Sequence, residues 1–266
     1  MSGNVVAVSS GKGGVGKTSL TVNLAVALTA NGKKVLVCDG DLGLANVDIT
    51  LGLKPQFDLH HVLSGEKTLE QIVIQGPEGV GVIPAASGIS KMLELSQAER
   101  LEMGLAFAEL SRQYDVVLLD TAAGIGQDVL SFLSGAQHVI VVVCDEPTSL
   151  TDAYALIKVS ATERRVSRFQ IVANKVKGAG HGLQVYKKLL NATDQFLDVN
   201  LSYLGAVPTD QRVLESIKER TPVMSLYPRS QASTAIRDIA EGLQKLLKSD
   251  IETDGIAALF KTHDMS

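Results

Sequence analysis

The chain has 266 residues, of which 45% are hydrophobic and 20% charged, and its formal net charge is −4. This balance excludes a disordered chain, and no segment approaches the roughly 18 consecutive apolar residues of a membrane span. The N-terminus lacks the cationic and apolar regions of a secretory signal, so we expect a cytoplasmic protein. Cys38 and Cys144 each lie in an apolar run, which is typical of free buried thiols and not of a disulfide framework.

Short runs rich in Val, Ile and Leu alternate with segments of helical period along the chain. The alternation predicts an α/β fold with a doubly wound, mostly parallel sheet, helices on both faces and ligands at the carboxyl ends of the strands. The predicted strands are residues 5–9, 35–39, 80–84, 116–120, 138–144, 170–174 and 199–207. The predicted helices are residues 18–30, 96–113, 148–162 and 183–197.

The pattern continues without a linker, a repeat or a low-complexity tract until about residue 249. We therefore predict one domain over residues 1–248, followed by an acidic connector and a short amphipathic tail over residues 249–266. In the tail, Ile256, Leu259 and Phe260 have the spacing of a one-sided apolar stripe on a helix.

A glycine-rich segment follows the first predicted strand directly. Residues 11–18 read Gly-Lys-Gly-Gly-Val-Gly-Lys-Thr, which satisfies G-x-x-x-x-G-K-[ST] and opens into the first predicted helix. Glycines let the backbone approach phosphate oxygens closely, so that N–H groups and the helix N-terminus converge on the anion. Lys17 would reach the terminal phosphates, and the Thr18 hydroxyl would bind Mg²⁺. The expected nucleotide contacts in this loop are Gly13, Gly14, Val15, Gly16, Lys17, Thr18 and Ser19.

A second lysine, Lys12, is unusual in such a loop. It is either a solvated cation or a side chain that reaches the nucleotide of a neighbouring subunit, as an arginine finger acts in trans. The string from Lys12 to Thr18 resembles the deviant Walker A motif of the MinD/ParA superfamily of dimerising ATPases. That resemblance implies the second role, in a homodimer that forms with ATP.

Aspartates end two predicted strands, at Asp39 with Asp41 just beyond it and at Asp120. Phosphoryl hydrolysis needs a Mg²⁺ ligand and a group that orients the attacking water, and strand-end aspartates beside the phosphate loop commonly supply both. In the superfamily the matching positions imply that Asp41 positions the water, Asp39 supports the metal shell and Asp120 holds Mg²⁺ through water. The segment after Asp120 resembles switch II, where Gly124 lets the backbone respond to the γ-phosphate.

The sequence is less specific about the nucleoside. Asn174 offers both a donor and an acceptor to a purine edge, although Asn and Pro-x-Asp are also common in turns. The family resemblance places nucleotide contacts at Asn174, Pro208, Asp210 and Glu146. Residues 174–177 read Asn-Lys-Val-Lys and so lack a guanine signature, which favours ATP, with Mg²⁺, over GTP.

Several strings outside the phosphate loop resemble one branch of the superfamily, the FlhG (FleN/YlxH) group. They include residues 41–48, 84–88 and 120–125, and the Cys-Asp-Glu-Pro-Thr-Ser segment at residues 144–149, which ATP hydrolysis does not require. The resemblance implies a slow, dimer-activated ATPase that limits flagellar number. Its implied partners are an FlhF-type GTPase and either an FlrA/FleQ-type transcriptional regulator or a C-ring protein. The family also implies that the protein cycles on and off the inner membrane through its tail or sits at a cell pole. On the sequence alone, docking of the tail on its own domain remains the alternative.

Two other classes remain open on the sequence. A ParA-type partition ATPase would bind DNA through a basic surface, and Arg164, Arg165 and Arg168 cluster, but the net charge of −4 leads us not to expect direct nucleic-acid binding. An electron-transfer ATPase would need cysteine ligands in loops, whereas Cys38 and Cys144 lie in predicted strands.

Overall fold

The computed structural model describes residues 3–41, 46–84 and 96–249. The amphipathic tail expected around Ile256, Leu259 and Phe260 lies outside these ranges, as does the acidic connector after Ser249. Within the described part of the chain, no helix is long and apolar enough to cross a bilayer.

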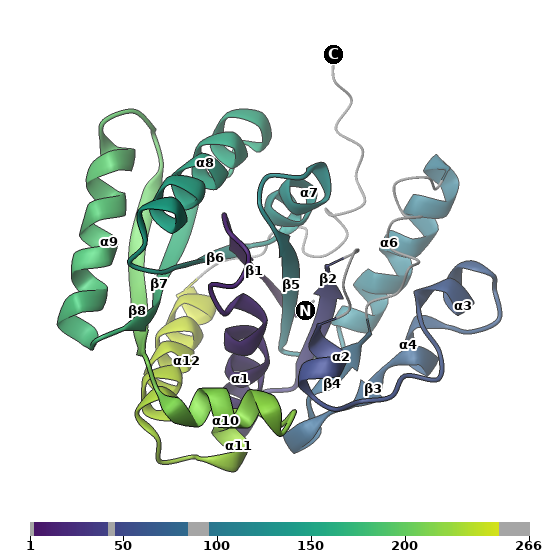
Figure 1. Ribbon diagram of the computed structural model, residues 1–266. Helices are drawn as coiled ribbons and strands as arrows, with labels where there is room; N and C mark the ends of the chain where they lie inside the picture. The colour runs from purple at the N-terminus through teal and green to yellow at the C-terminus, as the bar shows by residue number, and fades with distance from the viewer. Residues whose placement is uncertain (1–2, 42–45, 85–95, 250–266) are drawn as a thin grey trace.

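The described residues form an eight-stranded sheet in the order β3-β4-β2-β5-β1-β6-β7-β8 (Figure 1). Neighbouring strands are parallel except β3 and β4 at one edge. The strands are β1 (Asn4–Ser10), β2 (Val35–Gly40), β3 (Ile74–Gln75), β4 (Gly81–Ile83), β5 (Val116–Ala123), β6 (His138–Val143), β7 (Arg168–Val176) and β8 (Asn200–Pro208).

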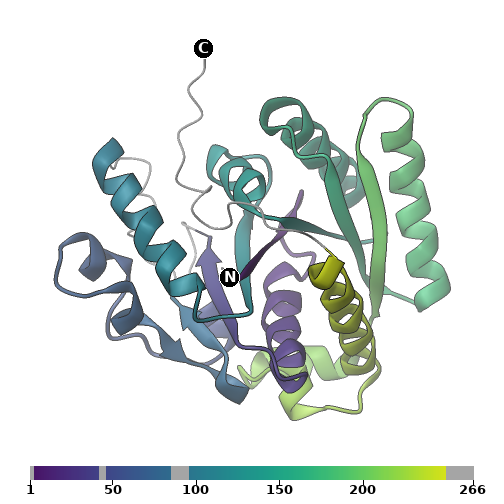
Figure 2. The same ribbon diagram turned by 180° about the vertical axis from the view of Figure 1, so that it is seen from behind.

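Helices cover both faces of this sheet (Figures 1 and 2). One hydrophobic core lies between the sheet and α3 (Leu59–Leu63), α4 (Leu69–Ile72), α6 (Gln97–Ser111), α7 (Gln127–Gly135), α8 (Pro147–Arg164) and α9 (Ala179–Asp194). The other lies between the sheet and α1 (Lys17–Ala30), α2 (Val47–Thr50), α11 (Val223–Leu226) and α12 (Gln231–Ser249). A 3-10 turn (Pro77–Gly79) and α10 (Gln211–Lys218) complete the described elements. The doubly wound, mostly parallel α/β fold is thus confirmed.

Every strand expected from the sequence is present, with small differences at the ends. The sequence reading missed the two-residue strand β3 and the helices α2, α3, α4, α7, α10, α11 and α12. Several of these are too short to show a periodic pattern, and α12 lies in a stretch of the predicted domain to which the sequence analysis assigns no element. The start of α9 was also misplaced, because its glycines resemble a loop. A side chain at Gly182 would collide with Ala206 and Tyr203, so close packing of α9 on β8 requires that glycine.

The topology gathers the functional segments at one edge of the sheet. Strand β1 lies in the middle, between β5 and β6, and its carboxyl end runs into the glycine-rich loop and then α1. All described strands other than β3 run parallel to one another. The segments that follow β2, β5, β6, β7 and β8 therefore leave the sheet at this same edge.

A buried asparagine fixes α1 to α11. Asn23 is only 2% exposed, its Nδ2 donates to the Ser19 carbonyl oxygen at 2.7 Å, and its Oδ1 accepts from the backbone N–H of Met224 at 3.0 Å. The two helices are therefore joined by a hydrogen bond between residues 201 positions apart in the sequence.

We predict that Asn23→Ala destabilises the protein by about 2 kcal/mol, because the buried N–H of Met224 loses its acceptor. Urea unfolding followed by circular dichroism measures this change. Asn31→Ala, at an exposed position just after α1, is the control and should change the stability by less than about 0.5 kcal/mol. Equal unfolding midpoints for the two variants would contradict the prediction.

Candidate nucleotide-binding site

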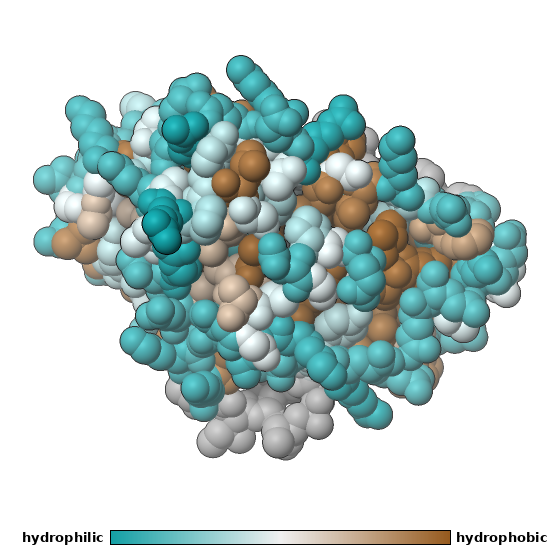
Figure 3. All heavy atoms as spheres, turned by 90° about the horizontal axis from the view of Figure 1, so that it is seen from below, coloured by the Kyte–Doolittle hydropathy of each residue, from teal (hydrophilic) through white to brown (hydrophobic). Residues whose placement is uncertain are grey.

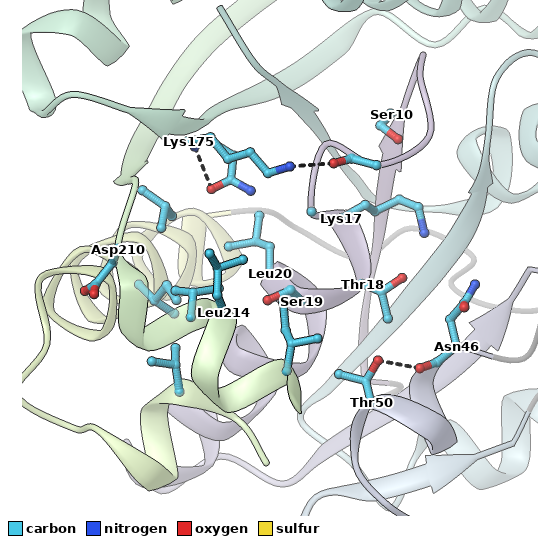
Figure 4. A pocket seen from close by; sticks show the side chains of 18 of the residues that line it. Ser10, Lys17, Thr18, Ser19, Leu20, Asn46, Thr50, Lys175, Asp210 and Leu214 are labelled. Atoms are coloured by element: carbon cyan, nitrogen blue, oxygen red, sulfur yellow. Dashed lines mark hydrogen bonds between the residues drawn. The ribbon is translucent and has the colours of Figure 1, made fainter. Parts of the chain in front are cut away.

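A cavity of about 690 Å³ lies at the carboxyl edge of the sheet (Figure 4). It brings together most of the residues that the sequence singled out. The cavity is lined by Gly13, Gly14, Gly16, Lys17, Thr18 and Ser19 from the loop and α1, by Asp41 after β2, and by Asn174, Pro208 and Asp210 from the ends of β7 and β8. Lys12, Val15, Asp39, Asp120, Gly124 and Glu146 are not among its lining residues and lie around it.

The loop owes its shape to glycine. Gly14 and Gly16 have φ angles of 79° and 91°, in the left-handed region that favours glycine. Gly16 also precedes the first residue of α1, so the unpaired N–H groups of the first helical turn begin beside the cavity. A helix N-terminus of this kind binds anions through its N–H groups and its dipole.

A buried charged network lies beneath the loop. The Lys17 ammonium is 2.9 Å from Asp120 Oδ1, and these side chains are 8% and 0% exposed. The Thr18 hydroxyl donates to Asp120 Oδ2 at 2.6 Å. The Thr21 hydroxyl lies 2.9 Å from Asp120 Oδ1 and 3.1 Å from the Lys17 carbonyl oxygen. Sequence reasoning missed Thr21, which lies one turn after the phosphate-loop lysine in a helix that also contains other polar residues.

The donor set of this network suits Mg²⁺. A threonine hydroxyl and a carboxylate lie within hydrogen-bonding distance of each other, and hard oxygen ligands are what Mg²⁺ prefers. Mg²⁺ is usually bound in proteins by one or two such groups, with substrate phosphates and water supplying the remaining ligands. Thr18 and Asp120 therefore fit the metal of a Mg-nucleotide.

Asp39 is buried beside Asp120. The two residues are paired in the register of β2 and β5, and Asp39 is 1% exposed. Its carboxylate accepts hydrogen bonds from the backbone N–H groups of Asp41, Asn46 and Val47 at 2.8–3.0 Å. Burial raises the pKa of Asp39 to about 6 in spite of these bonds, and the nearby Asp120 charge adds to the effect. Asp39 thereby holds the ends of the segment between β2 and α2.

Asp41 is the residue expected to position the water, and Gly124 lies on the segment that resembles switch II. Asp41 is partly buried and lines the cavity, and Asn46 Nδ2 donates to its Oδ2 at 3.3 Å. Gly124 has a φ of 97°, which favours glycine, and its N–H donates to the Ser10 carbonyl oxygen at 2.9 Å. The segment after β5 is thus hydrogen-bonded to the end of β1, immediately before the phosphate loop.

Lys12 contacts its own subunit in this structure. Its ammonium is 2.9 Å from Glu146 Oε2 and 3.0 Å from the Thr148 hydroxyl. The contact with Lys12 lowers the pKa of Glu146, and the contact with Glu146 raises the pKa of Lys12. The Lys12 and Glu146 side chains are 39% and 56% exposed, so solvent screens their attraction and the pair breaks at little cost.

The residues expected at the base have structural roles as well. Asn174 Nδ2 donates to the Val15 carbonyl oxygen at 2.7 Å. Asp210 caps α10 through the N–H of Arg212 and accepts from the N–H of Ala232 at the start of α12. Burial acts to raise the pKa of Asp210, but hydrogen bonds, chiefly those from Ala232 and Arg212, outweigh it and leave the pKa low. Asp210 therefore joins α10 and α12 beside the cavity.

Sequence reasoning missed Lys175 and an apolar wall of the cavity. Leu20 of α1 and Leu214 of α10 line the cavity together with Val213, Ile217, Val223 and Ile236 (Figure 4). Part of α10 stays open to solvent, since Leu214 and Ile217 are 54% and 48% exposed. Seen from below, the surface shows separate apolar patches among polar side chains (Figure 3). Val213, Leu214 and Ile217 have the spacing of one face of a helix, which was the available signal for this wall. The sequence analysis assigns no helix there.

The structure also describes the arginine cluster considered for a partition ATPase and the two cysteines considered for an electron-transfer ATPase. Arg164 donates to the Gln127 side chain at 2.7 Å, so one member of the arginine cluster is engaged with α7. Cys38 and Cys144 are buried free thiols, as expected from the sequence. Cys144 lies behind the phosphate loop, where its Sγ is 3.7 Å from the Val15 carbonyl oxygen.

Comparisons with known proteins agree with this geometry. Residues 3–171 match a family model described as an AAA domain. The chain is 46% identical to the antiactivator FleN of Pseudomonas aeruginosa over 237 residues, covering 89% of this chain and 85% of that protein. It is 33% identical to the flagellum site-determining protein YlxH of Helicobacter pylori, covering 96% and 88%.

Solved structures of MinD share the fold. The cell division ATPase MinD of Pyrococcus furiosus matches with a TM-score of 0.74 at 29% identity, covering 92% of this chain and 99% of that one. MinD of Pyrococcus horikoshii, solved in complex with Mg-ADP, matches with a TM-score of 0.73 at 29% identity, covering 93% and 99%. The phosphate loop, the buried Lys17–Asp120 network and these similarities lead to one conclusion. The chain belongs to the MinD/ParA family of P-loop ATPases, in the group that contains FleN and YlxH.

Proposed function

We propose that this chain is a Mg²⁺-dependent ATPase that dimerises with ATP and acts as a negative regulator of flagellar number or placement. The observation that supports the enzymatic part best is the buried network of Lys17, Thr18 and Asp120. It lies beneath a glycine-rich loop whose cavity extends to Asn174 and Asp210. This continuous cavity supports the proposal that one nucleotide contacts the loop with its phosphates and the ends of β7 and β8 with its base.

The chain's own residues divide the work in this proposal. N–H groups of the loop and the start of α1 bind the phosphates, and Lys17 turns from Asp120 toward them. Thr18 and Asp120 would hold Mg²⁺, which would neutralise charge on the phosphates. Asp41, at the cavity wall, orients the attacking water, and Asp39 keeps the segment that carries Asp41 in place. Gly124 allows the segment after β5 to respond to the γ-phosphate.

Lys12 is proposed to act across the dimer. Its contacts with Glu146 and Thr148 are exposed and easily exchanged, so the ammonium can leave them for the nucleotide of the second subunit. Glu146 would then be available to contact nucleotide itself. Hydrolysis removes the γ-phosphate that both subunits contact, and the dimer returns to monomers.

The regulatory part of the proposal rests on the relatives, which are described as an antiactivator and as a flagellum site-determining protein. We infer that the ATP dimer engages an FlhF-type GTPase and an FlrA/FleQ-type transcriptional regulator or a flagellar C-ring protein. We further propose that the tail with Ile256, Leu259 and Phe260 brings the protein to the inner membrane or the cell pole as a peripheral protein. A direct role in DNA binding is not part of the proposal.

Lys17→Ala should weaken Mg-ATP binding at least about 100-fold, because a charged hydrogen-bond donor is lost from a buried site. Isothermal titration calorimetry measures the affinity, and circular dichroism checks that the variant is folded. Lys34→Ala, which removes an exposed lysine just before β2, should bind as the unchanged protein does. Tight ATP binding by Lys17→Ala would contradict the phosphate-loop assignment.

Asp41→Ala should bind ATP normally and hydrolyse it at least about 100-fold more slowly, because the attacking water is no longer oriented. The variant should accumulate as an ATP-bound dimer, measured by size-exclusion chromatography with light scattering. Adding Lys12→Ala to this variant should return it to a monomer. A monomeric Asp41→Ala protein in saturating ATP would rule out the proposed switch.

The trapped Asp41→Ala dimer also tests the regulatory part of the proposal. Used as bait in a lysate of flagellated cells with ATP, it should retain the GTPase, the transcriptional regulator or the C-ring protein, identified by mass spectrometry. The monomeric Lys12→Ala, Asp41→Ala variant is the control and should retain none of them. Equal recovery on both baits, or recovery of DNA in place of these proteins, would count against flagellar regulation.

A further inference from the structure

The turn from β6 to α8 contains the Cys-Asp-Glu-Pro-Thr-Ser segment of residues 144–149, which ATP hydrolysis does not require. In the structure, Asp145 of this turn contacts α9. Its Oδ2 lies 2.7 Å from His181 Nε2, and its Oδ1 accepts from the Lys188 ammonium at 2.6 Å. His181 and Lys188 lie two helical turns apart on one face of α9. We call these three side chains the Asp145 clamp.

Both oxygens of the Asp145 carboxylate accept a hydrogen bond in this clamp. His181 Nδ1 accepts the backbone N–H of Lys177 at 3.1 Å, so His181 Nε2 is the ring nitrogen that carries the proton and donates to Asp145. The hydrogen bond from Lys188, and then the one from His181, lowers the pKa of Asp145. Asp145 is therefore an anion at neutral pH, and charge assists both contacts.

Helix α9 gives the clamp a fixed support. Figures 1 and 2 show α8 and α9 side by side on one face of the sheet. Val185 and Leu189 of α9 are 0% and 1% exposed in the core beneath the helix. Gly182, next to His181, lets the helix approach β8, because a side chain there would collide with Ala206. The clamp thus ties the start of α8 to a helix whose position the core already sets.

The residue after Asp145 faces the phosphate loop. Glu146 is the N-cap residue of α8, but its side chain makes no capping hydrogen bond and instead contacts Lys12 at 2.9 Å. The turn is closed by a hydrogen bond from the Cys144 N–H to the Ser149 hydroxyl at 3.0 Å. The direction in which Glu146 points therefore depends on the backbone of this turn, which Asp145 holds against α9.

The proposed dimer makes this support important. When Lys12 leaves for the second subunit, Glu146 loses the cation that it contacts in the monomer. A turn without other support would then have to be ordered again as the dimer forms, and ordering a backbone costs free energy. The contacts of Asp145 with α9 do not involve Lys12, so they remain when Lys12 departs. The turn is thereby ordered before the second subunit arrives.

We propose that Asp145 is a positioning residue, which His181 and Lys188 hold so that the β6–α8 turn presents Glu146 to the ATP-bound dimer. This inference rests on the proposed ATP-dependent dimerisation and assigns a role to a residue that the phosphate-loop motif does not include. The clamp supports the step in which two subunits join. Its loss weakens the dimer and leaves the affinity of a single subunit for ATP unchanged.

The test measures the dimer dissociation constant of the full chain carrying Asp41→Ala, in saturating Mg-ATP, by analytical ultracentrifugation. Asp145→Ala should weaken the dimer about tenfold, because the turn loses both contacts with α9. Lys188→Met should weaken it about threefold, since this contact is half exposed, and Lys188→Arg should restore it. Adding Lys188→Met to Asp145→Ala should have no further effect. Lys187→Met, at the neighbouring exposed lysine, is the matched control and should change the constant less than twofold.

The affinity of a single subunit for ATP is measured by isothermal titration calorimetry of the Lys12→Ala, Asp41→Ala protein, which the proposed function expects to be monomeric. Adding Asp145→Ala should change this affinity less than twofold. A loss as large as the loss of dimer affinity would mean that the turn shapes the nucleotide pocket, and it would overturn the proposal. Equal dimer affinities for Asp145→Ala and Lys187→Met would overturn it as well.

ATPase activity at increasing protein concentration separates positioning from a general loss of structure. With Asp41 intact, Asp145→Ala should need about tenfold more protein to reach half of its maximal turnover per subunit, and the maximum should match that of the unchanged protein. A lower maximum would mean that Asp145 affects hydrolysis or folding and would contradict the proposal. Failure of the Asp41→Ala protein to dimerise while its clamp is intact would instead contradict the proposed function.

Discussion

The buried ion pair between Lys17 and Asp120 is the interaction on which the site depends. Removing two charges from water is costly, and the pair is tolerated because Thr18 and Thr21 add hydrogen bonds to the same carboxylate. The network joins the start of α1 to the end of β5, and β5 pairs with β1, which leads into the loop. The Lys17 cation and the Asp120 carboxylate are thereby held in contact with each other beneath the phosphate loop. In the proposed mechanism, Lys17 exchanges the Asp120 carboxylate for the phosphates of the nucleotide, so its charge keeps an anionic partner.

Around this pair, backbone groups are held mainly by side chains from neighbouring strands. Asp39 closes the segment after β2 through three backbone N–H groups, and Asn174 and Lys175 hold two carbonyl groups of the phosphate loop. The two glycines with positive φ let the loop bend, but glycine lacks a side chain that could fix one bend among many. The surrounding side chains therefore supply the order that the loop's own composition does not.

The sequence predicted the sheet and the phosphate loop well, because both have local signals. Apolar runs of strand length mark β1, β2, β5 and β6, and the loop motif is contiguous from Gly11 to Thr18. The sequence did not predict the short helices between residues 47 and 72, nor α10 and α12. The first group is too short for a period of 3.6 residues to repeat. Helix α10 has only eight residues, and its apolar side chains Leu214 and Ile217 are about half exposed beside the cavity. Thr21 and Lys175 were missed for the related reason that their partners are 99 and 161 residues away.

By itself, the sequence determined the fold class, the phosphate loop, the strand-end aspartates and the preference for ATP with Mg²⁺. Each of these is encoded in a few consecutive residues or in the alternation of strands and helices, so local pattern suffices. Only the tertiary structure decided that Lys17 pairs with Asp120, that Lys12 lies against Glu146 in its own subunit, and that Lys175 contacts the loop. Those contacts join loops, helix ends and strands that become neighbours only when the chain folds, and no pattern within one segment specifies which groups will meet.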